Sequence, residues 1–349
     1  MLSSGIKRVK GETKELLPDD LKREIISRVP ISYHPVASTI CQDFSNFIQL
    51  RHVYGDRAKI HKAETVIHIS LMSENYVLDW YTLHKKAFVD EFVLRPLPQF
   101  PVVPVKRHNL IASGSRIYAI SWENSENMYV DCKSYLTVRV PSTTCNETLA
   151  VIKRQLYVIG DLNLETSSAF LKSLDIDDND EWKVVNFPLA LDHSNYPIFS
   201  NLIVLNNKIY FIGNSGRRCV VFDPDNLTME RMNSKGMGRH SYDSSCVIND
   251  RLFCFEKNNK LKVHVNGNTW VHVRGLKNKL PKFDSGSTKL FNLSGKLLIL
   301  QNSNRKDILV TVVSLEDRHG EMWGNVFSSN VALRLPYRTF IVHALEVEL

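Results

Sequence analysis

Two groups of residues in this sequence are candidates for binding a metal ion, and neither has the ligand spacing of a metal site. His264 and His272 lie in neighbouring strand-like segments and are able to share a face. A zinc site needs a third ligand, so histidines on a strand surface are the simpler interpretation. The acidic group Asp175, Asp177, Asp178 and Asp180 lacks the ligand spacing of a calcium loop. It comes just before Trp182, where a solvated hairpin turn is predicted.

Nucleophiles and phosphate-binding loops are equally hard to assign. The sequence has no GxxxxGK[ST], GxSxG or HExxH motif, and Gly236-Met237-Gly238 precedes Arg239-His240 rather than a helical pattern. The six cysteines, at 41, 132, 145, 219, 246 and 254, include no CxxC pair. Buried thiols that pack as small apolar groups are therefore expected. We predict no catalytic residue, no metal and no cofactor.

A different kind of chemistry, apolar binding, is suggested near the N-terminus. Leu21, Ile25 and Val29 are spaced by four, which places them on one face of a helix. Pro18 and two aspartates suit the first turn of that helix, and Pro30 ends it. A second short helix is predicted with Ser32 as its cap, and a third carries Phe44 and Ile48 and continues to about His61.

These three helices form too small a unit to bury all of their apolar side chains. Residues 15–62 hold them, after a basic and flexible segment at 1–14. About 45 residues bury little core alone. The excess apolar surface predicts that the unit docks, either onto the rest of the chain or onto a partner helix.

From residue 63 to 349 the apolar period becomes two, which indicates an all-β domain. One element recurs five times: a basic or polar residue, then Ile or Leu, then an aromatic or Leu, then two apolar residues. Its central residues are Tyr118, Tyr157, Tyr210, Phe253 and Leu298. Three or four strands every 40–50 residues is typical of a β-propeller. A β-sandwich is the main alternative.

A sixth unit is predicted upstream, with strands at 66–71, 80–83 and 92–94. It lacks its first strand, because helix precedes it. The C-terminal segment 340–347 has the pattern of a strand without a partner. We predict that it supplies the innermost strand of the first blade, and that it closes a ring of six blades and covers two open sheet edges.

Charge and hydropathy limit the class of protein further. The net charge is +7, of which residues 1–62 carry +4, so the large domain is nearly neutral for its size. That balance argues against a nucleic-acid-binding face. No apolar run approaches the roughly 20 residues of a membrane helix, and the N-terminus does not have the pattern of a secretory signal. We expect the chain in the cytoplasm or the nucleus.

Two regions of the sequence, one in the helical part and one in the strand-rich part, resemble a known family. Leu17-Pro18-Asp19-Asp20-Leu21 with Arg28-Val29-Pro30, followed by Ile40-Cys41 and Phe44, is similar to an F-box. Trp80-Tyr81-Thr82-Leu83 and Ser113-Gly114-Ser115-Arg116-Ile117-Tyr118 are similar to the plant F-box/kelch-repeat family. The double glycine of kelch repeats is reduced to single glycines at Gly160 and Gly213.

The resemblance implies a small all-α F-box followed by an all-β kelch-type propeller. It further implies a non-catalytic subunit of an SCF-type ubiquitin ligase, which binds a Skp-type adaptor and, through it, a cullin and a RING subunit. The adaptor-binding residues would be Leu17, Pro18, Leu21, Ile25, Val29, Ile31, Cys41, Phe44 and Ile48. The same side chains would instead pack on the propeller if the chain were a scaffold outside such ligases.

The propeller would then hold an unidentified target protein for ubiquitination. Large or charged residues in predicted loops are the candidates for that contact, because Arg and Trp are typical interface anchors: Trp122, Arg217, Arg218, Arg239 and His240. A propeller with its own small-molecule or enzymatic site is the alternative. The carboxylate pair that glycosidase chemistry requires cannot be placed from the sequence.

Overall fold

The computed structural model describes most of the chain in two compact units, residues 1–63 and 64–349. The residues described are 17–86, 88–97, 100–101, 108–121, 126–141, 149–159, 171–178, 181–185, 199–213, 219–232, 244–256, 260–265, 269–282 and 288–349.

The first unit contains four short α-helices and one 3₁₀ turn. They are α1 (Asp19–Arg28), η1 (Ile31–Tyr33), α2 (His34–Ala37), α3 (Gln42–Gln49) and α4 (His52–Lys59). Pro18 stands at the N-cap of α1, and Asp19 and Asp20 occupy its first turn, as predicted. The core of the unit is built from buried apolar side chains of α1, η1, α2 and α4, whereas α3 contributes none that is fully buried: Ile26, Ile31, Ala37, Val53 and Tyr54.

Two details of the predicted helices are wrong. Ser32 does not cap the second helix, because it lies inside η1, and α2 begins at His34 after Tyr33. The third helix does not continue to His61. It ends at Gln49, since Arg51 has a left-handed φ of 61° that no continuous α-helix accepts, and α4 begins at the next residue. The Arg51 guanidinium lies 4.4 Å from the centre of the Tyr54 ring, which stabilises this break.

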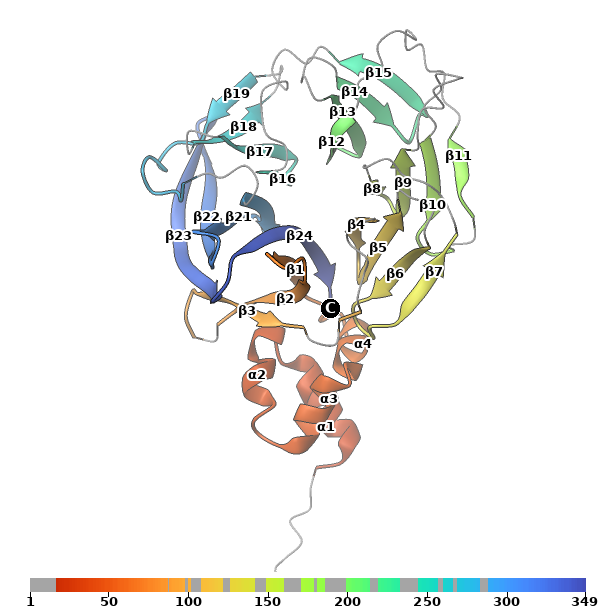
Figure 1. The fold of residues 1–349 in the computed structure, drawn as a ribbon, viewed down its shortest axis with the longest axis vertical. Helices are drawn as coiled ribbons and strands as arrows, with labels where there is room; N and C mark the ends of the chain where they lie inside the picture. The colour runs from red at the N-terminus through yellow and green to blue at the C-terminus, as the bar shows by residue number, and fades with distance from the viewer. Residues whose placement is uncertain are drawn as a thin grey trace, which may run out of the picture. The chain divides into compact units, whose positions relative to one another are not determined.

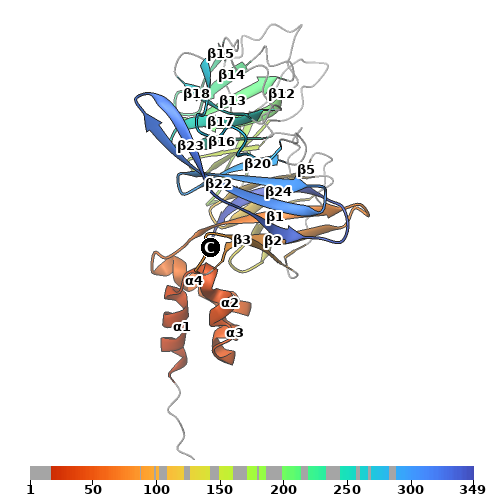
Figure 2. The same ribbon diagram turned by 90° about the vertical axis from the view of Figure 1, so that its left-hand side faces the viewer.

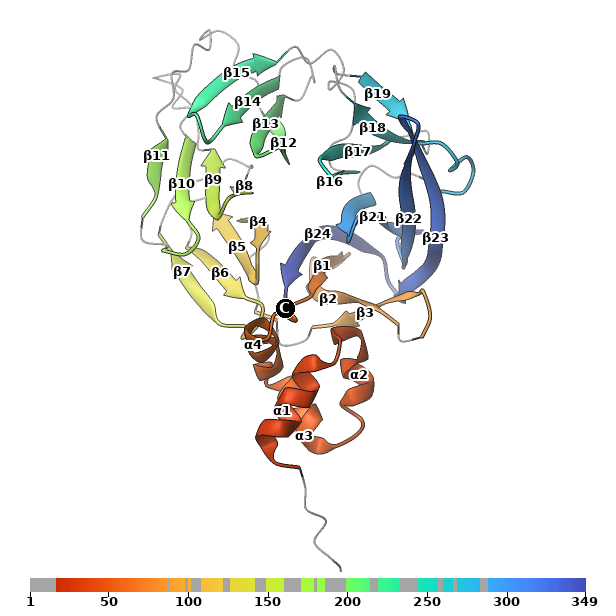
Figure 3. The same ribbon diagram turned by 180° about the vertical axis from the view of Figure 1, so that it is seen from behind.

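The second unit is a six-bladed β-propeller (Figures 1 and 3). Each blade is a four-stranded antiparallel sheet. The strands of the first three blades are β24 (Thr339–Glu348), β1 (Thr65–Ser73), β2 (Leu78–Lys85) and β3 (Phe92–Pro96); β4 (His108–Ser113), β5 (Arg116–Ser121), β6 (Asn127–Asp131) and β7 (Thr137–Val140); and β8 (Leu149–Ile152), β9 (Gln155–Ile159), β10 (Leu171–Asp175) and β11 (Lys183–Val185).

The last three blades have the same order. They comprise β12 (Phe199–Leu205), β13 (Lys208–Gly213), β14 (Cys219–Asp223) and β15 (Thr228–Met232); β16 (Ser245–Ile248), β17 (Arg251–Glu256), β18 (Lys260–Val265) and β19 (Thr269–His272); and β20 (Thr288–Leu293), β21 (Lys296–Ser303), β22 (Asp307–Arg318) and β23 (Glu321–Arg334). The five repeated elements are therefore the second strands β5, β9, β13, β17 and β21, as the repeat predicted.

The C-terminal strand closes the ring as predicted. β24 pairs antiparallel with β1 from Thr65↔Glu348 to Ser73↔Thr339, so the first blade takes one strand from the end of the chain and three from its beginning. The backbone of Glu64 and Leu349 exchanges two hydrogen bonds of 2.8 and 2.9 Å at the end of this ladder. The closure pairs the edge of β1 that would otherwise be open, so the first blade has four strands like the others.

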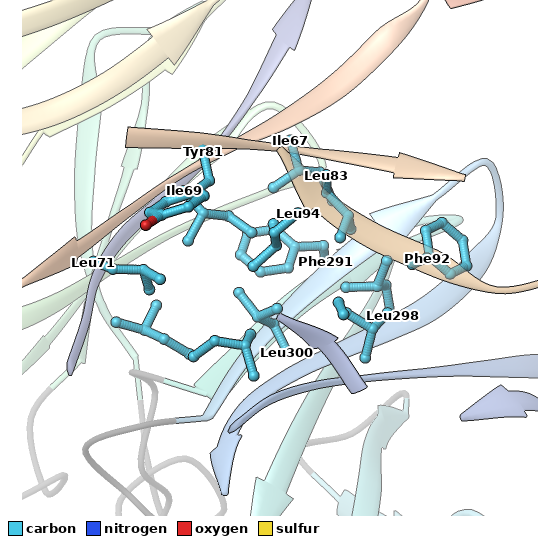
Figure 4. Packing of buried hydrophobic residues seen from close by; sticks show 14 of the residues in the cluster. Ile67, Ile69, Leu71, Tyr81, Leu83, Phe92, Leu94, Phe291, Leu298 and Leu300 are labelled. Carbon is cyan, nitrogen blue, oxygen red and sulfur yellow. The ribbon is translucent and has the colours of Figure 1, made fainter. Parts of the chain in front are cut away.

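The apolar core of the propeller lies between neighbouring blades. Figure 4 shows one of these layers, in which Ile67, Ile69 and Leu83 of the first blade meet Phe291 and Leu298 of the last. An amide adds a polar link between the same two blades. The Asn330 side chain accepts a hydrogen bond from Phe92 N at 3.0 Å and donates one to Phe92 O at 2.7 Å.

Candidate functional site

The outer face of α1 carries a stripe of exposed apolar side chains. Leu17, Leu21 and Ile25 are 49%, 48% and 44% exposed. Leu21 and Ile25, spaced by four, lie on one side of α1, and Leu17 comes two residues before the helix begins, while Ile26 and Ser27 are buried. The apolar side chains exposed to solvent are therefore distinct from those that form the core of the unit. An exposed apolar stripe of this kind is suited to binding a partner protein.

Further exposed apolar side chains lie in α2, in the connection from α2 to α3, and directly after α3. Val36, Ile40 and Leu50 are 53%, 69% and 65% exposed, and Cys41 is an exposed free thiol. The sequence reasoning left the first three out of the predicted adaptor-binding set. Val36 and Ile40 are four residues apart, so their periodicity was the available signal. Together with the stripe on α1, these side chains give the helical unit a large apolar surface.

The remaining predicted adaptor-binding residues differ in accessibility. Pro18 is exposed, and Val29, Phe44 and Ile48 are half-buried. Ile31 does not fit a surface role in this structure, because its side chain is only 2% exposed. It starts η1, where it turns inward and completes the core of the helical unit.

Ion pairs fix α1 against the helices behind it. Lys22 Nζ lies 2.7 Å from Asp43 of α3 and 2.9 Å from Asp19, and these carboxylates raise the pKa of Lys22. Arg23 contacts Asp56 of α4 at 2.7 Å. The pairs Lys22–Asp43 and Arg23–Asp56 join α1 to α3 and to α4. Ion pairs near a surface contribute little to the free energy of unfolding, so their main effect is on the orientation of α1.

A buried arginine donates hydrogen bonds to backbone carbonyls at the C-terminal end of α1. Arg57 is 2% exposed, and its guanidinium donates to the carbonyls of Ser27 at 3.0 Å, Val29, and Lys62 at 2.5 Å. Helix C-termini leave carbonyls without an intrahelical partner, so a cation there both caps the helix and complements its dipole. This role could not be predicted from the sequence, where Arg57 is only a basic residue that the structure places in the last turn of α4.

His34 lies beside this cap. Its Nε2 is 3.0 Å from the Val29 carbonyl, and its side chain is 3% exposed. Burial, and secondarily the charge of Arg57, lower the pKa of His34 to about 4. At neutral pH this histidine is uncharged, and it donates from Nε2 to the same carbonyl that Arg57 contacts.

The predicted target-binding residues, Trp122, Arg217, Arg218, Arg239 and His240, lie outside the described residues. Three of them, Trp122, Arg217 and Arg218, follow a second strand of a blade, and Arg239 and His240 follow a fourth strand. Their contact with a target stays a prediction.

Within the described ranges, no group of three or more His, Cys, Asp or Glu side chains is arranged to hold a metal ion.

None of the helices described has the length and apolar character needed to cross a membrane.

Comparison with known proteins assigns the family. A model of the F-box domain matches residues 15–54, and a model of the FKB95 kelch-repeats domain matches residues 80–333. The chain belongs to the plant F-box/kelch-repeat family. The helices α1 to α3 lie within the F-box match, and the strands from most of β2 to most of β23 lie within the kelch match. The kelch match does not include β1 and β24, the two strands that close the ring.

Curated relatives agree along nearly the whole chain. The F-box/kelch-repeat proteins At4g39240 and At4g14905 of Arabidopsis thaliana are 28% and 27% identical to it. Each alignment covers 95% of this chain, and 90% and 91% of the respective relative. The combination of an F-box with a kelch propeller fits a substrate-recognition adaptor of SCF-type ligases, and an F-box implies a Skp-type adaptor as partner.

Proposed function

We propose that this F-box/kelch-repeat protein is the substrate-recognition subunit of an SCF-type ubiquitin ligase. In this proposal the F-box binds a Skp-type adaptor, which connects it to a cullin and a RING subunit, and the propeller holds a target protein for ubiquitination. The chain itself carries out no catalysis. We place its action in the cytoplasm or the nucleus.

The exposed apolar stripe of α1 is the observation that carries the proposal. Leu17, Leu21 and Ile25 remain 44–49% exposed although the unit has a formed core behind them. Burying three such side chains in a partner groove supplies much of the free energy of a helix-in-groove contact. A scaffold that used them only within this chain would not need them exposed.

Co-purification with a plant Skp-type adaptor tests the proposal. The full chain is expressed with the adaptor, next to a variant with Leu17→Ala, Leu21→Ala and Ile25→Ala. A matched control carries Leu136→Ala, Val138→Ala and Val184→Ala, three apolar propeller residues that are 40–66% exposed.

We expect the wild type and the control to capture the adaptor, and the α1 variant to lose it. Because all six positions are exposed, the thermal midpoints of the three proteins should agree within a few degrees. A folded wild type that captures no adaptor would exclude the proposed function.

A further inference from the structure

Three turns of the propeller meet at one end of the last and first blades. They are residues 74–77 between β1 and β2, residues 304–306 between β21 and β22, and residues 335–340, which connect β23 to β24 and begin it. Antiparallel pairing places these turns at one end of the two sheets, opposite the end where β24 finishes at Glu348. Figure 2 shows these blades from the side. We call residues 74–77, 304–306 and 335–340 the turn surface.

Hydrogen bonds hold the turn surface in one arrangement. Thr339 N donates to Arg305 O at 2.8 Å, and Leu335 N donates to Lys306 O at 3.0 Å. Arg338 lies 3.6 Å from Glu74 across the neighbouring turn. The buried Asn302 side chain donates to Thr339 O at 2.5 Å beneath them. A partner would therefore meet a preorganised surface, and would not have to order it on binding.

Large apolar side chains are exposed on this surface. Tyr76 and Val77 are 67% and 56% exposed, and Tyr337 and Phe340 are 40% and 39% exposed. The guanidinium of Arg305 lies 5.7 Å from the centre of the Phe340 ring. Aromatic residues and arginine on a rigid surface are the residue types that dominate protein interfaces.

The charge of the turn surface is positive. It contains Arg305, Lys306 and Arg338 against the single acid Glu74, a balance of +2. Glu74 is already paired with Arg338. Arg305 and Lys306 are exposed, and within the described part of the chain neither makes an ion pair. A negatively charged partner would therefore find two cations available without displacing another carboxylate.

We propose that the turn surface docks an acidic segment of the target protein that carries aromatic or aliphatic side chains. The inference rests on the proposed function, since a receptor requires a surface that holds its target. Single-stranded nucleic acid also favours cations next to aromatic rings. The protein segment is preferred because the chain from residue 63 onward carries only +3 over 287 residues.

A random 12-residue peptide library displayed on phage, selected on the full chain, identifies what the propeller binds. Enriched peptides are then made with a fluorescent label and titrated by anisotropy. The test variant is Arg305→Glu with Lys306→Glu, and a second variant is Tyr76→Ala with Tyr337→Ala. The control, Lys183→Glu with Lys260→Glu, changes the net charge equally at two exposed positions outside the turn surface.

We expect acidic peptides with apolar residues to be enriched, and both turn-surface variants to bind them at least about tenfold more weakly than the control does. Binding of the peptides should weaken as salt is added. Enrichment of peptides without net negative charge, or equal affinity for the charge-reversed variant and the control, would overturn the proposal. So would a single-stranded 20-nucleotide DNA that binds the surface as tightly as the peptides do.

The result is separable from the test of the ligase role. Arg305→Glu with Lys306→Glu should still co-purify with the Skp-type adaptor, because neither residue belongs to the F-box. Failure of the wild type to capture the adaptor removes the ligase role but leaves peptide binding as measured. Failure of the peptide selection removes the docking surface but leaves adaptor capture intact.

Discussion

Arg57 connects three backbone carbonyls of the helical unit. Its guanidinium bonds to Ser27 O and Val29 O at the end of α1, and to Lys62 O beyond α4. Hydrogen bonds to a charged group contribute more than neutral ones, and a buried acceptor that loses its donor is costly. The residue thereby couples α1, which bears exposed apolar side chains, to α4.

Replacing Arg57 with Met should destabilise the helical unit by about 2–4 kcal/mol, because Met keeps the apolar stem but donates no hydrogen bond. Far-UV circular dichroism at 222 nm follows the unfolding of the helices in urea. The matched control is Arg28→Met, an arginine whose side chain is 59% exposed. Equal unfolding midpoints for the two variants would contradict this role of Arg57.

His34 should make the stability of the helical unit depend on pH. Its pKa is about 4 in the folded chain and near 6.5 when unfolded, so the unfolded state binds the proton more tightly. Stability from this group is therefore complete above about pH 6.5 and is lost as the pH falls towards 4. Between pH 6.5 and 5 the loss should be on the order of 2 kcal/mol.

The variant His34→Gln isolates this effect, because Gln cannot titrate and has an amide to offer the Val29 carbonyl. Urea unfolding of both proteins is followed at 222 nm at several values of pH. His343, whose pKa burial also lowers to about 4, is present in both proteins. We expect the wild type to lose more stability than the variant. Parallel pH profiles would show that His34 is not the group responsible.

At the scale of elements, the ring depends on a strand from the far end of the chain. β24 pairs with β1 along nine residue pairs, and its Ile341 lies in the apolar layer between the last and first blades. Removing it would expose the edge of β1 and part of that layer to water. The blades would then form an open row of sheets.

Deleting residues 339–349 should abolish the cooperative unfolding transition of the propeller. All five tryptophans lie at residue 80 or later, so tryptophan fluorescence during heating reports on the propeller and not on the F-box. Deletion of residues 1–11, an equally long segment outside the described residues, is the control and should leave the transition in place. A truncated chain that kept the wild-type midpoint would refute closure by β24.

The strands were more predictable than the helix ends. Each repeated element places a residue such as Tyr118, Phe253 or Leu298 in the centre of a second strand, where all three are at most 1% exposed. A pattern that recurs five times averages out local irregularities. The break before α4 had no such signal, because Arg51 is neither Gly nor Asn and its left-handed φ is stabilised by contact with Tyr54.

The candidate site was predictable only where it depended on periodicity. Leu17, Leu21 and Ile25 follow a helical spacing, so their common face could be inferred. Ile31 was predicted to bind the adaptor only from the family resemblance, and the resemblance could not show that η1 turns this side chain into the core. The turn surface unites segments more than 200 residues apart in sequence, and only the closure of the ring brings them together.

In the whole molecule, the two units have different proposed roles. The F-box presents apolar side chains that suit an adaptor, and the propeller offers the turn surface for a target. Both roles require that the chain enters an SCF-type ligase, and assembly with the other ligase subunits is therefore the property to measure.

Size-exclusion chromatography with light scattering measures it most directly. The full chain is mixed with a plant Skp-type adaptor, a cullin and a RING subunit, and the mass of the eluting complex is determined. We predict one peak whose mass equals one copy of each subunit, and its loss for the variant with Leu17→Ala, Leu21→Ala and Ile25→Ala. A folded wild-type chain that elutes alone, beside a complete complex of the other three, would contradict the account.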